Sequence, residues 1–152
     1  MGLRKMIVTD TFLILTALIY IKIVRLKGVK MKTPMDLVLE AKQEIPEVSV
    51  DELKGKLDRD DNLVLIDVRE GEEFSQGCIP SAIHMSRGTL EFQIGSQVPN
   101  QDQEIVLYCA AGARSLLAAQ SLEKMGYKSL FSVEGGFRQW LDEGYEVASV
   151  EY

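Results

Sequence analysis

One cysteine of this sequence stands where an apolar run ends and a helical pattern begins. The stretch LYCAAGARS contains Cys109 and, five positions later, Arg114. The residues between them are all small: Ala110, Ala111, Gly112 and Ala113. Small side chains leave the main-chain amides of the turn free to face the sulfur, and both a helix N-terminus and an arginine attract an anion. We therefore expect Cys109 to be a nucleophilic thiolate rather than a buried apolar side chain.

The spacing of the cysteine and the arginine limits which anion the loop can hold. Phosphatases of the cysteine type place one more residue between the two, which is wide enough to surround a phosphate, and they carry histidine before the cysteine. Here four residues separate Cys109 from Arg114, and Tyr108 precedes the cysteine. The tighter ring suits one added sulfur atom, a persulfide, whose negative charge the amides would stabilise. A phosphatase or arsenate reductase is therefore the less favoured alternative.

Apolar runs alternate with amphipathic segments along the chain, and this pattern positions the loop. Residues 63–68 and 105–108 are continuous apolar runs, as buried parallel strands are, and residues 129–133 are a further candidate strand. Alternating strands and helices indicate an α/β fold around a mainly parallel sheet. We expect residues 70–74 to be a polar turn and residues 145–149 an edge strand. Sites in such folds form where strands end and helices begin, which is the position of the cysteine loop.

The composition excludes several classes of protein. Of 152 residues, 46% are hydrophobic and 26% charged, which is typical of a globular domain. Two cysteines are too few for a disulfide framework, so a reducing compartment is expected. Residues 1–30 carry a net charge of +5 and the rest of the chain −11. Because an acidic body does not attract nucleic acid, a nucleic-acid partner is excluded.

The first thirty residues form a separate hydrophobic segment. Residues 6–24 have about the length that spans a bilayer, although they include Asp10 and Lys22. One interpretation is a helix that tethers a cytoplasm-facing body to the inner membrane. The other is an upstream extension of a soluble cytoplasmic protein that begins at Met31, where a good helix opening follows.

The loop sequence CAAGAR resembles the active-site loop of single-domain rhodaneses, the thiosulfate sulfurtransferases. Four further motifs match the family in the family's order: LIDVRE (Leu65–Glu70), GCIPSAIH (Gly77–His84), RGTLEF (Arg87–Phe92) and VEGGFRQW (Val133–Trp140). The resemblance covers residues 46–148, with residues 31–45 as a linking helix and residues 1–30 as the hydrophobic N-terminal segment. It implies a rhodanese-like fold, with a central, mainly parallel five-stranded sheet flanked by helices.

The resemblance also implies a reaction. Cys109 would take a sulfane sulfur from thiosulfate or a persulfide donor and pass it to cyanide or a thiol acceptor, with residues 110–114 cradling the persulfide. No metal and no organic cofactor is required. The alternative is a sulfur carrier or regulatory module without catalysis of its own, a class of rhodanese-like proteins in which the cysteine is usually lost.

Arg114 and Cys78 have two interpretations each, and Asp67 and Arg69 have one. Arg114 either attracts an anionic donor or pairs with a neighbouring carboxylate and shapes the loop. Since the loop holds no other charge, a persulfide donor is expected to serve better than thiosulfate. Asp67 and Arg69 are of a kind that, in the family, supports loops beside the site. Cys78 replaces the usual histidine of its motif, and it is either a tolerated substitution or a thiol that resolves an oxidised or persulfidated Cys109 as a disulfide.

Overall fold

The computed structural model describes residues 14–20 and 31–150. It divides into two compact units, residues 1–33 and 34–152. In the first unit, residues 14–20 are helical, and the rest of the predicted span over residues 6–24 lies outside the described residues. Within the described ranges, no helix is both long and apolar enough to cross a bilayer.

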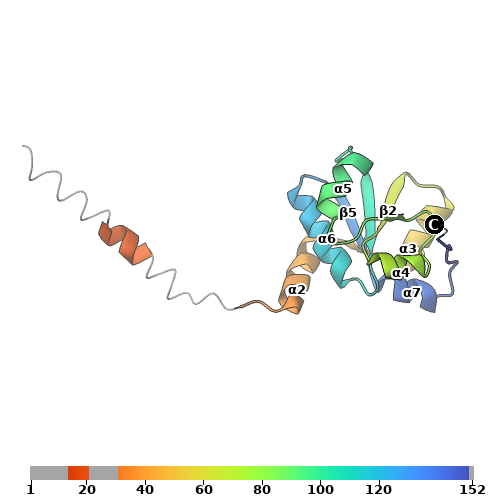
Figure 1. The fold of residues 1–152 in the computed structure, drawn as a ribbon, viewed down its shortest axis with the longest axis horizontal. Helices are drawn as coiled ribbons and strands as arrows, with labels where there is room; N and C mark the ends of the chain where they lie inside the picture. Colours follow the sequence, from red (N-terminus) through yellow and green to blue (C-terminus); the bar gives the residue numbers. More distant parts are fainter. Residues whose placement is uncertain (1–13, 21–30, 151–152) are drawn as a thin grey trace, which may run out of the picture. The chain divides into compact units, whose positions relative to one another are not determined.

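The second unit alternates helices and strands, as Figure 1 shows. Its elements are α2 (Pro34–Glu44), β1 (Glu47–Val48), α3 (Val50–Asp58), β2 (Leu63–Asp67), α4 (Gly71–Ser75), β3 (Ile83–His84), α5 (Leu90–Gln97), β4 (Glu104–Tyr108), α6 (Ala113–Lys124), β5 (Ser129–Val133) and α7 (Gly136–Asp142). The strands form one sheet in the order β1-β5-β4-β2-β3, and all neighbouring pairs are parallel. The predicted five-stranded α/β fold is thus confirmed, and the sheet is parallel throughout. Because β4 is the middle strand, its carboxyl end lies at the centre of the sheet edge.

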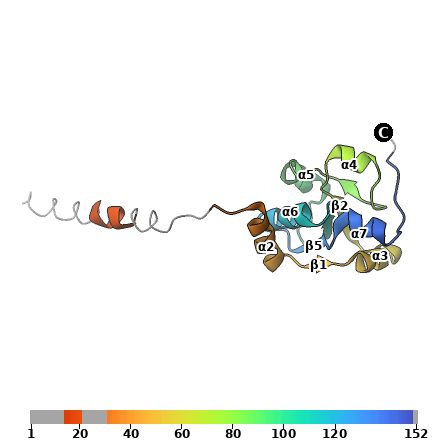
Figure 2. The same ribbon diagram turned by 90° about the horizontal axis from the view of Figure 1, so that it is seen from below.

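Two helical layers cover the sheet, and their arrangement can be followed in Figure 2. One hydrophobic cluster joins α2, α5 and α6 to the sheet, and a second joins α3 and α7 to it. Both faces of the central strands are therefore buried, which explains why these strands are continuous apolar runs in the sequence.

Side chains of β4 alternate between the two clusters. Ile105 and Leu107 belong to the cluster beneath α6, whereas Val106 and Tyr108 belong to the cluster beneath α7. Cys109 follows the same period of two and lies in the α6 cluster. The Cys109 side chain thus lies on the face of the sheet that α6 covers, opposite α7.

The predicted polar turn over residues 70–74 is wrong, because this segment forms the helix α4. The amide of Glu70, which precedes the helix, donates to the carboxylate of Glu73 at 3.1 Å, and this bond closes the first turn. Glutamate is an uncommon residue at this capping position, so the sequence pattern did not indicate a helix start.

The predicted edge strand over residues 145–149 is reduced to a single antiparallel bridge between Cys78 and Ala148. The amide of Cys78 donates to the Ala148 carbonyl at 3.1 Å, and the amide of Ala148 donates to the Cys78 carbonyl at 2.9 Å. The C-terminal segment therefore lies against the Cys78 backbone without extending the sheet.

The hydroxyl of Tyr108 provides a test of how the second cluster is held together. It is fully buried, it accepts a hydrogen bond from the Ile79 amide at 3.1 Å, and burial raises the pKa of Tyr108, so the phenol stays neutral. Tyr108→Phe leaves this buried amide unpaired and is expected to lower the free energy of unfolding by about 1–3 kcal/mol in a urea titration. Tyr145→Phe is the control, because its hydroxyl bonds Asp51 at an exposed site. Equal losses in the two variants would contradict this assignment.

Candidate active site

Cys109 lies directly after β4, at the start of the turn that leads into α6. Its sulfur accepts a hydrogen bond from the Gly112 amide at 3.1 Å, and only 2% of the residue is exposed. Gly112 precedes the first residue of α6 with a φ of 95°, a left-handed conformation that a residue with a Cβ rarely adopts. The glycine therefore allows the turn to close tightly on the sulfur.

A buried pair of hydroxyls lies behind the sulfur. The Ser115 hydroxyl is 3.6 Å from Cys109 Sγ and 2.9 Å from the Gly112 carbonyl, and it lies 2.8 Å from the Ser132 hydroxyl. If Ser132 donates to Ser115, the single Ser115 proton remains available to the sulfur or to the carbonyl. Sequence reasoning missed both serines. The available signal for Ser115 was its position in the first turn of a helix, where a hydroxyl can reach back three residues.

The start of α7 holds the backbone of the loop from the other side. The amide of Phe137 donates to the Cys109 carbonyl at 2.7 Å, and the amide of Arg138 donates to the Ala110 carbonyl at 3.0 Å. In a trans peptide unit the carbonyl and the following amide point in opposite directions. The amides of Ala110 and Ala111 therefore point away from the α7 amides that hold these two carbonyls.

The loop amides are left available as donors. Among the described residues, no oxygen accepts a hydrogen bond from the amides of Ala110, Ala111, Ala113 or Arg114. Together with the Gly112 amide, which already donates to the sulfur, they are suited to stabilise a negative charge on an atom attached to Cys109.

Arg114 is paired with a carboxylate of α4, which is one of its two predicted roles. Its guanidinium donates to both oxygens of Glu73, at 2.7 and 2.9 Å. This pairing lowers the pKa of Glu73 to about 2 and raises the pKa of Arg114. Glu73 had not been singled out from the sequence, because its partner is far away in the chain. The ion pair fixes the first turn of α6 against α4.

Asp67 and Arg69 form a buried ion pair away from the sulfur. Arg69 donates to Asp67 through Nε at 3.0 Å and through its terminal nitrogen at 2.6 Å, and it also donates to the Gly77 carbonyl at 2.8 Å. The guanidinium lies 4.1 Å from the centroid of the Phe137 ring. Since the Phe137 amide holds the Cys109 carbonyl, this stack connects β2 to the loop.

Cys78 lies in different surroundings from Cys109. Burial, followed by the charge of Asp67, raises the pKa of the Cys78 thiol, which makes it a poor nucleophile. The next residue, Ile79, is bonded to the Tyr108 hydroxyl on the α7 side of the sheet, whereas Cys109 belongs to the α6 side. The alternative in which Cys78 resolves Cys109 as a disulfide stays a prediction, as does the alternative of a tolerated substitution.

One family model and several known proteins match this chain over the region that carries the site. The model of a family described as Rhodanese-like domain matches residues 49–143. YtwF of Bacillus subtilis, named as a sulfurtransferase, is 39% identical over 100 residues, which are 66% of this chain and 94% of YtwF. YrkF of the same organism, named as a sulfur carrier protein, is 38% identical over 96 residues, which are 63% of this chain. The match spans only about half (51%) of YrkF.

Solved structures share the fold. The polysulfide-sulfur transferase homodimer of Wolinella succinogenes is 30% identical, with a TM-score of 0.64 over 76% of this chain and 86% of that one. RPA3614 of Rhodopseudomonas palustris, a protein of unknown function described as a possible tyrosine phosphatase, is also 30% identical. Its TM-score is 0.71 over 80% of this chain and 98% of that one.

Replacing Gly136 tests whether α7 holds the loop at close range. A Cβ at this position, where φ is 60°, would lie 2.4 Å from the Cys109 carbonyl oxygen and 2.9 Å from the Ala110 carbonyl carbon. Gly136→Ala is therefore expected to lower the melting temperature and to displace the loop. The displacement should expose the sulfur, so the measured rate of Cys109 alkylation should rise. Gly95→Ala is the matched control, because a Cβ at this position on α5 would meet nothing within 4 Å. It should leave stability unchanged or raise it by about 0.5–1 kcal/mol, and a similar result for Gly136→Ala would contradict the close contact.

The Glu73–Arg114 pair predicts a pH dependence of stability. Glu73 has a pKa of about 2 in the folded protein, against an ordinary value of 4.5. The ion pair therefore stabilises the fold at pH values above about 4.5. This contribution should be lost as the pH falls from about 4.5 to about 2. The difference in unfolding free energy between wild type and Glu73→Gln should therefore be largest near neutral pH, and added salt should reduce it, since 35% of the Glu73 side chain is exposed.

Glu72→Gln is the control for this series, since Glu72 also lies in the first turn of α4 while Arg114 pairs with Glu73. It should leave the pH profile of stability as in the wild type. A Glu73→Gln difference that stays constant from pH 7 to pH 2 would contradict the proposed pairing.

Proposed function

This chain belongs to the rhodanese-like domain family, and from that premise we propose that it is a sulfurtransferase that carries sulfur on Cys109. The named functions of its relatives, sulfurtransferase and sulfur carrier, support sulfur transfer in general. The donor and the acceptor are proposed below from the chemistry of the site.

The reaction has two steps. In the first, the Cys109 thiolate attacks the outer sulfur of thiosulfate, a sulfur–sulfur bond breaks, and sulfite leaves with the bonding electron pair. With a persulfide donor, the leaving group is the donor's thiolate. In the second step, cyanide or an acceptor thiolate attacks the outer sulfur on Cys109, which releases thiocyanate or a new persulfide and restores the Cys109 thiolate.

One observation carries this proposal: the Gly112 amide of the loop donates to the Cys109 sulfur at 3.1 Å, and the neighbouring loop amides have no oxygen acceptor among the described residues. A persulfide at neutral pH bears its charge on the outer sulfur, where amides of a short loop can donate to it. Donors that are already in place stabilise such a charge without reorganisation. Because the four-residue spacing leaves less room than a phosphate requires, the same loop supports sulfur chemistry over phosphoryl chemistry.

The charges around the loop bear on the choice of donor. Arg114 is bound to both oxygens of Glu73, so the loop itself offers no unpaired cation to a thiosulfate dianion. A persulfide donor needs less charge compensation than thiosulfate. We therefore expect a higher kcat/KM with a low-molecular-weight persulfide than with thiosulfate, and cyanide or a thiol as acceptor.

A sulfur carrier is the second candidate function. YrkF, which resembles this chain over about half (51%) of its own length, is named as a carrier, and Cys109 could deliver its sulfur to a protein thiol. The two candidates differ in turnover. An enzyme forms many equivalents of thiocyanate from small-molecule donor and cyanide, whereas a dedicated carrier releases about one equivalent per loaded chain.

Replacing Cys109 tests the proposal. The full chain, incubated with thiosulfate or with glutathione persulfide, is expected to gain about 32 Da on Cys109, the mass of one added sulfur. Cyanide should remove this mass as thiocyanate. Cys109→Ser should gain nothing, whereas Cys78→Ser, which changes the other buried cysteine, should load as the wild type does.

Two results would contradict the proposal. One is a wild-type chain that takes no sulfur from either donor. The other is a Cys109→Ser variant that still transfers sulfur to cyanide. Hydrolysis of p-nitrophenyl phosphate that depends on Cys109, in the absence of sulfur loading, would favour the phosphatase alternative.

A further inference from the structure

Nearly every cation of the domain is paired with a carboxylate. Seven of the nine lysine and arginine side chains in residues 46–148 form ion pairs: Lys54–Asp58, Lys56–Glu104, Arg59–Asp61, Arg69–Asp67, Arg87–Glu91, Arg114–Glu73 and Lys128–Asp102. Only Lys124 and Arg138 have no ion pair with any described residue in this range. These two cations lie at different places in the fold.

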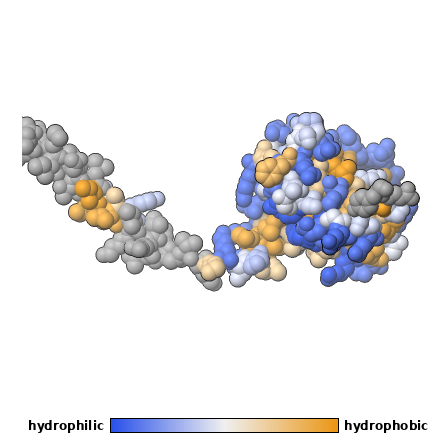
Figure 3. Space-filling view, in the orientation of Figure 1, coloured by the Kyte–Doolittle hydropathy of each residue, from blue (hydrophilic) through white to orange (hydrophobic). Residues whose placement is uncertain are grey.

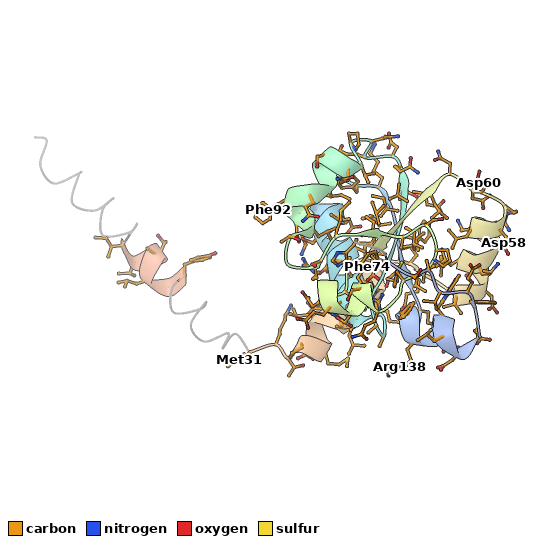
Figure 4. The ribbon with its side chains drawn as sticks, turned by 45° about the vertical axis from the view of Figure 1, so that its right-hand side comes forward. Met31, Asp58, Asp60, Phe74, Phe92 and Arg138 are labelled. Carbon is orange, nitrogen blue, oxygen red and sulfur yellow. The ribbon has the colours of Figure 1, made fainter. Side chains whose placement is uncertain are left out.

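Arg138 lies next to the cysteine loop. Its amide donates to the Ala110 carbonyl at 3.0 Å, and the amide of the preceding residue, Phe137, donates to the Cys109 carbonyl at 2.7 Å. Its side chain is exposed, and Figure 4 shows it at the edge of the molecule, at the start of α7. Lys124 is the last residue of α6, and the loop ends at the first residues of the same helix, Ala113 and Arg114, so Lys124 lies at the other end of α6.

The surroundings of the loop are otherwise unfavourable to an anion. The chain beyond residue 30 has a net charge of −11, and the face visible in Figure 3 is largely hydrophilic. Near the loop, Glu134 is exposed, and so is Asp142, one turn after Arg138 on α7. Arg114 is neutralised by Glu73 at 2.7 Å, and the pair does not attract an anion at a distance.

We propose that Arg138 supplies the positive charge that captures an anionic sulfur donor at the mouth of the Cys109 loop. The inference rests on the proposed function for the identity of the ligand, which is a sulfur donor with a sulfonate or carboxylate group. A guanidinium suits either group, because it can donate two parallel hydrogen bonds to a planar or trigonal oxyanion. Arg138 takes no part in the transfer of sulfur. It raises the rate of capture, and so acts on kcat/KM and not on kcat.

The first experiment measures the charge that Cys109 experiences, without any sulfur transfer. Cys109 is alkylated with iodoacetate, which is anionic, and with iodoacetamide, which is neutral, and its peptide is followed by mass spectrometry. Arg138→Glu should lower the ratio of the iodoacetate rate to the iodoacetamide rate about threefold to tenfold, and added salt should reduce this effect. Lys124→Glu makes the same change in charge at the distant position and should leave the ratio unchanged. Arg138→Lys should keep most of the wild-type ratio.

The second experiment measures transfer with two anionic donors, thiosulfate and glutathione persulfide, at low and high salt. Arg138→Glu should lower kcat/KM for at least one of them at low salt with kcat retained, and the donor affected identifies the ligand. Lys124→Glu should behave as the wild type. An unchanged alkylation ratio in Arg138→Glu, or an unchanged kcat/KM for both donors, would overturn the inference.

The failure of the proposed function looks different from the failure of this inference. If the wild type transfers no sulfur but Arg138→Glu still lowers the alkylation ratio, the charge of Arg138 does act on Cys109, and only the proposed donor chemistry is wrong. If the wild type transfers sulfur and the ratio does not change, the sulfurtransferase stands and Arg138 has no role in capture.

Discussion

The geometry of the site depends on two hydrogen bonds from the start of α7 to the cysteine loop. The amides of Phe137 and Arg138 donate hydrogen bonds to the carbonyls of Cys109 and Ala110, at 2.7 and 3.0 Å respectively. With these carbonyls fixed, the amides that follow them point away from α7 and stay available as donors beside the sulfur. The chemistry of the loop thus follows from the direction of peptide units rather than from any charged side chain within it.

The surrounding residues keep these two hydrogen bonds in place. Gly136 is needed because a Cβ there would lie 2.4 Å from the Cys109 carbonyl oxygen. Arg69, paired with Asp67, stacks on the ring of Phe137, and breaking such a buried pair leaves an uncompensated charge that costs about 3–5 kcal/mol. Residues from two separate motifs, 65–70 and 133–140, therefore act on one short loop. Residues that are distant from Cys109 in the sequence therefore hold the loop in its conformation.

The sequence was informative where local patterns decide the structure. Continuous apolar runs predicted the central strands, and the position of Cys109 between a strand and a helix predicted the site. It was uninformative where partners are distant in the chain, as for Glu73 with Arg114 and Ser132 with Ser115. The helix α4 was missed because its start depends on an uncommon capping residue. Long-range pairing of this kind leaves no periodic signal along the chain.

The central claim is that main-chain donors of the loop hold a charged sulfur atom attached to Cys109. A high-resolution crystal structure of the chain after loading with a sulfur donor tests it most directly. The account predicts a persulfide whose outer sulfur accepts hydrogen bonds from at least two amides among residues 110–114, with the loop unchanged. An outer sulfur directed into solvent, or a loop whose amides turn away from it, would contradict the account.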